Sequence, residues 1–318
     1  MSIEAPVRER GTVWLPRFQN DPMLAFSPEP TLRPARSPQL SMDSGVAGNH
    51  GNPAPVLAAI AEAGFTHVHW CHWWTGVKLY SPSEIEYIRW QLHVNGLKLQ
   101  DTHATDGGGL WGSSYRFERK LVHDLIKNRL EFTAELGGRA IVLHAPVEPK
   151  DPADARSFWG FMNEDLLYLE SWAREYGVAI ALEQTDTEPR NIETLLKMVA
   201  GTDPQYIGFC WDTGHGHIHN NDHQVLPLLK DRLMVLHFND NHGPVTDGSD
   251  PDTHLLPTYG SVNWSSVIEL LGASSYKGPI TLEVGHRPER YDGKFPKLSD
   301  FLSEAYARAA ELHRMWHR

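Results

Sequence analysis

Long apolar runs are absent from this 318-residue chain. No stretch approaches the ~20 consecutive apolar residues that a membrane-spanning helix needs. Residues 1–16 carry charges and contain no apolar core, unlike a secretory signal. We therefore expect a cytoplasmic protein without a membrane partner.

Cysteine is almost missing, since the chain contains only two. Cys71 and Cys210 both lie in apolar runs, where a small hydrophobic side chain is normally buried. Two such residues do not make a disulfide framework. We expect two buried thiols in a reducing compartment.

Basic residues are scarce relative to acidic ones. The chain has 29 Lys and Arg against 40 Asp and Glu, a formal net charge of −11, and its acids are spread along its length. Tight nucleic-acid binding draws much of its affinity from Lys and Arg that neutralise phosphates. The charge balance therefore argues against a nucleic-acid partner.

Five short apolar runs each end on a residue that can bind a metal. Runs of this length are typical of strands buried on both faces, as in a parallel sheet. In barrel enzymes, the chemistry lies at the carboxyl ends of such strands. The five runs lead into His144, Glu183, Asp212, His237 and Glu283.

A repeating unit of helix pattern, glycine and apolar strand runs through most of the chain. Strands are expected near residues 40, 67, 98, 141, 180, 208, 235 and 281. Eight strands that alternate with helices predict a (β/α)8 barrel over residues 39–318. A doubly wound sheet is the structural alternative, but the glycine-rich phosphate turn of its dinucleotide-binding members is absent. Residues 1–38 hold seven prolines and read as an irregular extension.

Local sequence patterns mark the boundaries of several expected helices. Ser81, Pro82 and Glu84 form a capping-box pattern at the start of one helix. Two further helices are expected over residues 121–136 and 163–176, each followed by glycine. The histidines at 217, 219 and 223 read as a solvated polar loop.

Four of the strand ends form a ligand set for a catalytic metal. Glu183, Asp212, His237 and Glu283 supply three carboxylates and one imidazole from consecutive strands. Burying three acids at one barrel mouth without a cation would be costly. Mn²⁺ is the first choice for this set, and Mg²⁺, Co²⁺ and Zn²⁺ also suit it.

Further residues near the expected strand ends are candidates for substrate binding. Trp73 and Trp111 offer aromatic faces for sugar C–H groups, and Arg287 offers a partner for a carboxylate or phosphate. His67 and His69 alternate on one strand and are expected to be satisfied polar residues. The candidate hydrogen-bond partners are His103, His144, His215 and His254.

The motifs around these positions resemble the xylose-isomerase-like barrels over about residues 40–310. This superfamily includes sugar isomerases, ketose epimerases, hydroxypyruvate isomerases, inositol-catabolism enzymes and a 3-dehydroshikimate dehydratase. The resemblance implies that Glu183, Asp212, His237 and Glu283 bind one divalent metal. The motifs that carry it are Ala181-Leu182-Glu183, Trp211-Asp212-Thr213-Gly214-His215, His237-Phe238-Asn239-Asp240-Asn241, Asp252-Thr253-His254-Leu255 and Leu282-Glu283. Many relatives continue with a Pro-Gly-x-Gly loop, where this chain reads Leu255-Leu256-Pro257-Thr258-Tyr259-Gly260.

We expect a metal-dependent sugar or polyol isomerase or epimerase. Glu183 and Glu283 would move a proton next to a carbonyl, and Asp212 and His237 would act as fixed ligands. The substrate would be a small sugar, polyol or hydroxy acid, and a homo-oligomer is compatible with the resemblance.

Three other functions stay open. A dehydratase of a cyclic hydroxy acid, similar to the 3-dehydroshikimate enzyme, would use the same metal. A three-zinc apurinic-site endonuclease uses nine ligands on this fold. Candidates for all nine exist here: His103, His144, Glu183, Asp212, His215, His237, Asp252, His254 and Glu283. A non-catalytic binding protein is the third, although none of the four metal ligands is lost.

Overall fold

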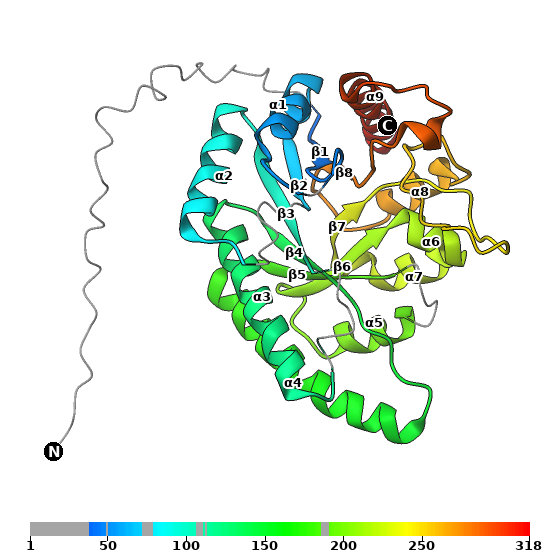
Figure 1. Cartoon of the computed structure of the whole chain (residues 1–318). Helices are drawn as coiled ribbons and strands as arrows, with labels where there is room; N and C mark the ends of the chain where they lie inside the picture. Colours follow the sequence, from blue (N-terminus) through cyan, green and yellow to red (C-terminus); the bar gives the residue numbers. More distant parts are fainter. Residues whose placement is uncertain (1–37, 49, 72–78, 106–110, 112, 186–190) are drawn as a thin grey trace, which may run out of the picture.

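The computed structural model describes residues 38–48, 50–71, 79–105, 111, 113–185 and 191–318. Its centre is an eight-stranded parallel sheet with strand order β7-β6-β5-β4-β3-β2-β1-β8. A parallel bridge between Phe238, just past β7, and Leu282 of β8 joins the two ends of this sheet. The sheet therefore closes into the expected (β/α)8 barrel, with helices around its strands (Figure 1).

The strands lie where the apolar runs predicted them. They are β1 (Leu40–Asp43), β2 (His67–Trp70), β3 (Lys98–Thr105), β4 (Ala140–His144), β5 (Ala179–Glu183), β6 (Ile207–Asp212), β7 (Leu233–His237) and β8 (Ile280–Leu282).

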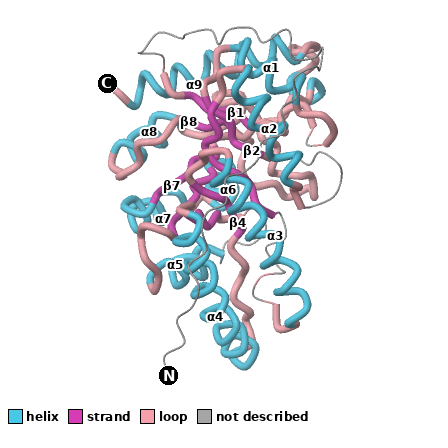
Figure 2. Tube along the Cα trace, turned by 90° about the vertical axis from the view of Figure 1, so that its left-hand side faces the viewer, coloured by secondary structure: helices cyan, strands magenta, loops and turns pink. Residues whose placement is uncertain are grey.

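The helices form the outer layer of the barrel (Figure 2). They are α1 (Ala54–Ala63), α2 (Pro82–Val94), α3 (Arg116–Glu135), α4 (Pro152–Tyr176), α5 (Asn191–Ala200), α6 (Thr213–His219), α7 (Asp222–Leu229), α8 (Trp264–Gly272) and α9 (Leu298–Trp316), with short 3-10 helices η2 (Lys230–Arg232) and η3 (Pro288–Tyr291).

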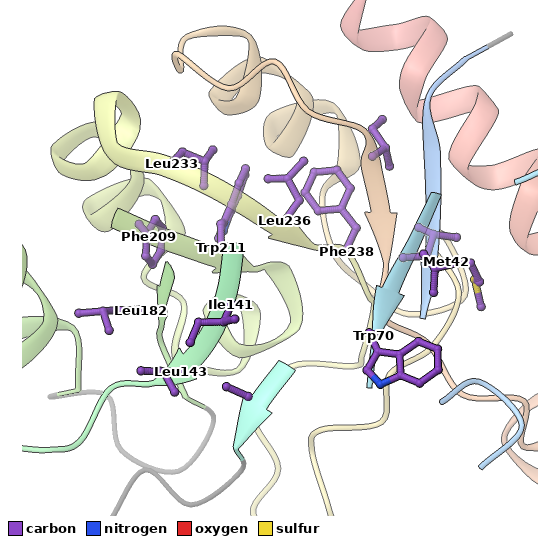
Figure 3. Close-up of a cluster of buried hydrophobic side chains, with 14 of the residues drawn as sticks. Met42, Trp70, Ile141, Leu143, Leu182, Phe209, Trp211, Leu233, Leu236 and Phe238 are labelled. Carbon is purple, nitrogen blue, oxygen red and sulfur yellow. The ribbon is translucent and has the colours of Figure 1, made fainter. Parts of the chain in front are cut away.

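Alternation along each strand divides its side chains between two cores. The outward-facing residues pack under the helices and form the main core. Figure 3 shows part of that layer, including Leu143, Phe209 and Leu236. The inward-facing residues form a separate small cluster of Ala140, Val142, Ala181, Cys210 and Val235. These small side chains fill the narrow barrel interior below the polar strand ends.

The capping-box prediction is confirmed at atomic detail. Ser81 Oγ accepts a hydrogen bond from the backbone N–H of Glu84, and the Glu84 carboxylate accepts one from the backbone N–H of Ser81. The pair satisfies two donors that the first turn of α2 would otherwise leave without partners.

Other local expectations need correction. Helix α3 starts five residues before residue 121, and α4 starts well before residue 163 because Asp151 caps it ahead of Pro152. His217 and His219 belong to α6 and His223 to α7, so the polar loop expected there is helical. Cys210 is buried as expected, whereas Cys71, past the end of β2, is only half-buried. Residues 1–37 of the expected extension lie outside the described residues.

Within the described part of the chain, no helix is both long enough and apolar enough to cross a membrane.

Removing one outward-facing side chain should test the main core. Leu143 of β4 is fully buried, so we expect Leu143→Ala to lower the free energy of unfolding by about 2–5 kcal/mol. Leu167 on α4 is 72% exposed, and Leu167→Ala should change it by less than about 0.5 kcal/mol. Urea unfolding followed by circular dichroism compares the two variants. Equal losses would mean that the described core is wrong.

Candidate metal centre

The polar strand ends occupy inward-facing positions. Each lies two residues beyond a member of the small inner cluster, so alternation turns it into the barrel mouth. The parallel register places His144 beside Glu183, and Asp212 beside His237. The sequence therefore brings together four polar ends from neighbouring strands: His144, Glu183, Asp212 and His237.

Glu183, His237 and Glu283 form the tightest group. Nδ1 of His237 lies 2.8 Å from Glu183 Oε1 and 3.1 Å from Glu283 Oε2. All three side chains are buried or nearly so. Two carboxylates from β5 and from the end of β8 thus converge on one nitrogen.

The opposite charges in this group stabilise one another. Burial alone would raise the pKa of Glu183, but the His237 imidazole and the nearby imidazoles of His103 and His144 hold it well below its usual value. Burial likewise opposes ionisation of Glu283, and His237 again outweighs it and keeps the pKa of Glu283 low. Both carboxylates are therefore ionised at neutral pH.

Asp212 is held at the same mouth by its neighbours. Its Oδ1 accepts the backbone N–H of His215 at 2.8 Å, which caps α6, and its Oδ2 accepts Asn239 Nδ2 at 2.8 Å. Burial raises the pKa of Asp212 to about 7, although His215 opposes the shift. A Cβ on Gly214 would lie 1.9 Å from Asn239 Oδ1, so only glycine fits the second position after Asp212.

A second group shares Glu183. Its Oε2 lies 3.5 Å from His103 Nε2 and 3.4 Å from His144 Nε2, and these two nitrogens are 3.2 Å apart. The donor atoms of all three residues are close enough together to hold one metal ion.

A third group joins His215 of α6 to Asp252 and His254 of the loop beyond β7. Asp252 Oδ2 is 2.9 Å from His254 Nε2 and 3.5 Å from His215 Nε2. His254 has a left-handed backbone, with φ of 44°, and its Nδ1 lies 2.8 Å from the carbonyl oxygen of Glu283. Burial opposes the charge on His254, but Asp252 outweighs it and raises the pKa of His254 to about 10.

These groups, apart from His237 and Asp212, line a cavity of about 610 Å³. Its walls include His103, His144, Glu183, His215, Asp252, His254, Glu283, Arg287 and Arg290. Arg290 is fixed by Asp250 and the carbonyl of Thr253, whereas Arg287 is exposed at the rim. The cavity has room for a sugar-sized molecule against the carboxylates.

Of the two tryptophans that we expected to bind substrate, the structure describes only Trp111. Trp73 lies outside the described residues. Trp111 is buried and is not part of the cavity wall. Its Nε1 donates a hydrogen bond to the carbonyl of His144 at 3.0 Å, so it supports a strand end from behind.

Two site residues, Asp43 and Asp101, were missed by the sequence analysis. A third, His69, was expected to be a satisfied polar residue, whereas its Nε2 has no hydrogen-bond partner among the described residues. Asp43 ends β1 and lines the cavity, and burial raises its pKa to about 6. His69 and Asp101 are fully buried and form a hydrogen-bonded pair between β2 and β3. The sequence signal was the inward alternation of these strands, since Asp43, His69 and Asp101 occupy inward positions like the predicted ligands.

The chemistry of this donor set fits a divalent cation. Oxygen and imidazole ligands suit Mn²⁺, Co²⁺ and Zn²⁺, and a cation would offset the clustered carboxylate charge. Glu183 Oε2 and Asp252 Oδ1 are buried and have no hydrogen-bond partner among the described residues. Buried carboxylate oxygens without hydrogen-bond partners favour the binding of a metal ion.

Comparison with known proteins gives the family. The profile of the xylose isomerase-like TIM barrel family matches residues 57–305, and the chain belongs to that family. An inosose dehydratase from Salmonella agona is 27% identical over 77% of this chain and 85% of its own length. The uncharacterized protein y4fM from Sinorhizobium fredii is 28% identical over 81% of this chain and 88% of its own length.

Solved structures share the fold. A D-tagatose 3-epimerase-like protein aligns with a TM-score of 0.68 and 23% identity, over 86% of this chain and 98% of that protein. The IOLI protein, solved with a bound zinc atom, aligns with a TM-score of 0.66 and 16% identity, over 87% of this chain and 98% of its own.

Replacing the central imidazole should weaken cation binding. His237→Gln removes the nitrogen nearest to both glutamates, and we expect at least a ~100-fold loss of Mn²⁺ affinity in calorimetric titrations of chelator-treated protein. His223→Gln is the matched control, because His223 is exposed on α7 and its Nε2 is hydrogen-bonded to Ser266. Unchanged affinity in His237→Gln would exclude His237 as a ligand.

Proposed function

We propose that this protein is a metal-dependent enzyme that abstracts a proton next to the carbonyl of a sugar or polyol and returns it as an isomerase or epimerase. The observation that carries the proposal is the pairing of Glu183 and Glu283. Both are ionised, both line the cavity, and both lie within 3.1 Å of one nitrogen of His237. They therefore approach one point from two different strands.

The chemistry needs this arrangement because a C–H group beside a carbonyl is a very weak acid. A bound divalent cation would stabilise the negative charge that develops on the substrate oxygen. One glutamate takes the proton from carbon and the other returns a proton to carbon. Each such proton transfer typically raises the reaction rate ~10²–10⁴-fold. Asp212 would hold the ligand geometry because the backbone N–H of His215 and the side-chain amide of Asn239 fix its two carboxylate oxygens. His237 would do so because its Nδ1 is fixed between Glu183 and Glu283.

The rest of the cavity supplies groups for substrate binding. His103, His144, His215 and His254 present ring nitrogens that suit the hydroxyl groups of a sugar or polyol. Arg287 at the rim suits a carboxylate or phosphate on the substrate. Trp111 would act only through His144, since it does not reach the cavity wall.

Solvent exchange tests the proton step directly. The protein is incubated with Mn²⁺ in D₂O and a panel of ketoses, inososes and hydroxy acids, and NMR follows the exchange. We expect deuterium to appear beside the carbonyl of one of these substrate classes. Glu183→Gln and Glu283→Gln should lower the exchange rate by at least ~10²-fold while the fold persists. Glu193→Gln, an exposed change on α5, is the control and should exchange at the wild-type rate. An active Glu183→Gln protein would refute the acid–base assignment.

A dehydratase is the second candidate, favoured by the inosose dehydratase relatives. The first step is the same proton abstraction, after which a hydroxyl group leaves from the adjacent carbon as water. The cavity offers Asp43 and His144 as groups near which that hydroxyl could be protonated. On inososes, we expect this enzyme to yield a product lighter by one water in mass spectrometry. Deuterium exchange without water loss would favour the epimerase.

The three donor groups also keep a three-metal endonuclease as a candidate. Elemental mass spectrometry on protein purified without added metal or chelator separates it from the others. We expect about one divalent cation per chain for the single-site enzyme. About three zinc ions per chain would overturn that expectation, and cleavage of abasic DNA would then be the assay.

A further inference from the structure

A buried histidine–aspartate pair lies beside the candidate centre, and the proposed proton transfer does not use it. His69 is the third residue of β2, and the parallel register sets it directly beside Asp101 of β3. Both side chains are fully buried, and His69 Nδ1 is hydrogen-bonded to Asp101 Oδ1. Because a carboxylate only accepts hydrogen bonds, Nδ1 carries the hydrogen and Nε2 is the nitrogen left to act.

Nε2 of His69 points to the centre and has no hydrogen-bond partner among the described residues. The nearby Glu283 Oε1 is 3.6 Å away, which is too long for a hydrogen bond. A buried nitrogen without a partner costs about 1–3 kcal/mol, so the fold would not favour it unless something binds there.

The distances around Nε2 suit a shared cation. The donor atoms of His69, His237 and Glu283 all lie within 4.8 Å of one another. Two ligands bonded to one ion at ~2.1 Å can be at most ~4.2 Å apart. Nε2 of His69 is 3.6 Å from Glu283 Oε1, and Nδ1 of His237 is 3.1 Å from Glu283 Oε2, so each nitrogen is within that limit of one oxygen of the same carboxylate.

We propose that His69 is an additional ligand of the cation bound by Glu183, His237 and Glu283, and that Asp101 is the positioning residue that fixes its ring. This inference rests on the proposed metal centre. A metal-bound histidine commonly gives its other N–H to a carboxylate, which sets the tautomer and the ring orientation. Asp101 and His69 have that arrangement.

The additional ligand changes which metal the centre prefers. A second imidazole makes the ligand set softer, which favours Co²⁺ and Zn²⁺ over Mg²⁺, a cation that prefers oxygen ligands and water. We expect Mg²⁺ to bind much more weakly than Co²⁺ to the chelator-treated protein.

X-ray absorption tests the ligand assignment without turnover. Full-length protein is loaded with one equivalent of Co²⁺, and imidazole rings are counted from their multiple-scattering signal. We expect His69→Gln to lose one imidazole and at least ~10-fold in Co²⁺ affinity. Asp101→Asn should keep the ring count but lose ~10–100-fold in affinity.

His67→Gln is the matched control. His67 is on the same strand and the same face, but it lies at the other end of β2, where its Nδ1 is 2.8 Å from Thr66 Oγ1 and it lines a separate hollow with Lys98 and Arg139. It should match the wild type in ring count and affinity.

The outcomes separate the two proposals. Equal ring counts in wild type and His69→Gln, with equal affinities, would overturn the role of His69 while leaving the exchange assay untouched. Loss of a ring in a protein that exchanges no substrate proton would support His69 and refute the proposed function. If His69→Gln does not fold, the number of imidazole rings in the wild-type spectrum decides. A single ring would be accounted for by His237 alone and would overturn the role of His69.

Discussion

The cost of removing carboxylates from water governs the mouth of this barrel. Glu183, Asp212 and Glu283 are buried there together, and each isolated buried charge would cost several kcal/mol. The chain compensates with imidazoles, chiefly His237, and with the backbone N–H of His215 at the start of α6. These partners offset the charge but leave Glu183 Oε2 without a hydrogen-bond partner among the described residues. The result is a site in which a divalent cation is the natural remaining partner.

The strands place these carboxylates at the mouth because their side chains alternate between the inside and the outside of the barrel. Special loop conformations are not needed for this placement. The inner cluster of Val142, Ala181, Cys210 and Val235 is apolar and small, so it closes the barrel below the site. The next inward position along each strand then faces the mouth. Outward neighbours such as Leu143 and Leu236 hold the same strands under the helices. Rigid strands packed on both faces fix the ligand positions more closely than loops would.

Much of this architecture could be predicted from the sequence because apolar runs and strand ends are local signals. The eight strands and the convergence of Glu183, His237 and Glu283 follow from them. Helix α6 was missed because its sequence, Thr213–His219, is rich in glycine and histidine, and its stability comes from Asp212 as a cap. The His69–Asp101 pair was missed because it depends on register between two strands, which no single strand pattern reveals.

The loop after β7 holds a residue other than glycine in a left-handed backbone conformation. Thr258 has a φ of +74°, a conformation that costs a side chain about 1–2 kcal/mol. Buried Asp240 holds the loop there, because its Oδ2 accepts the N–H of Thr258 and the indole N–H of Trp264. Asp240 also pairs with Leu255 through two backbone hydrogen bonds of 2.8 Å. The backbone pairing of Asp240 with Leu255 anchors the chain next to His254, and the carboxylate of Asp240 fixes the loop at Thr258. The hydrogen bonds of one buried residue therefore keep the third donor group facing the cavity.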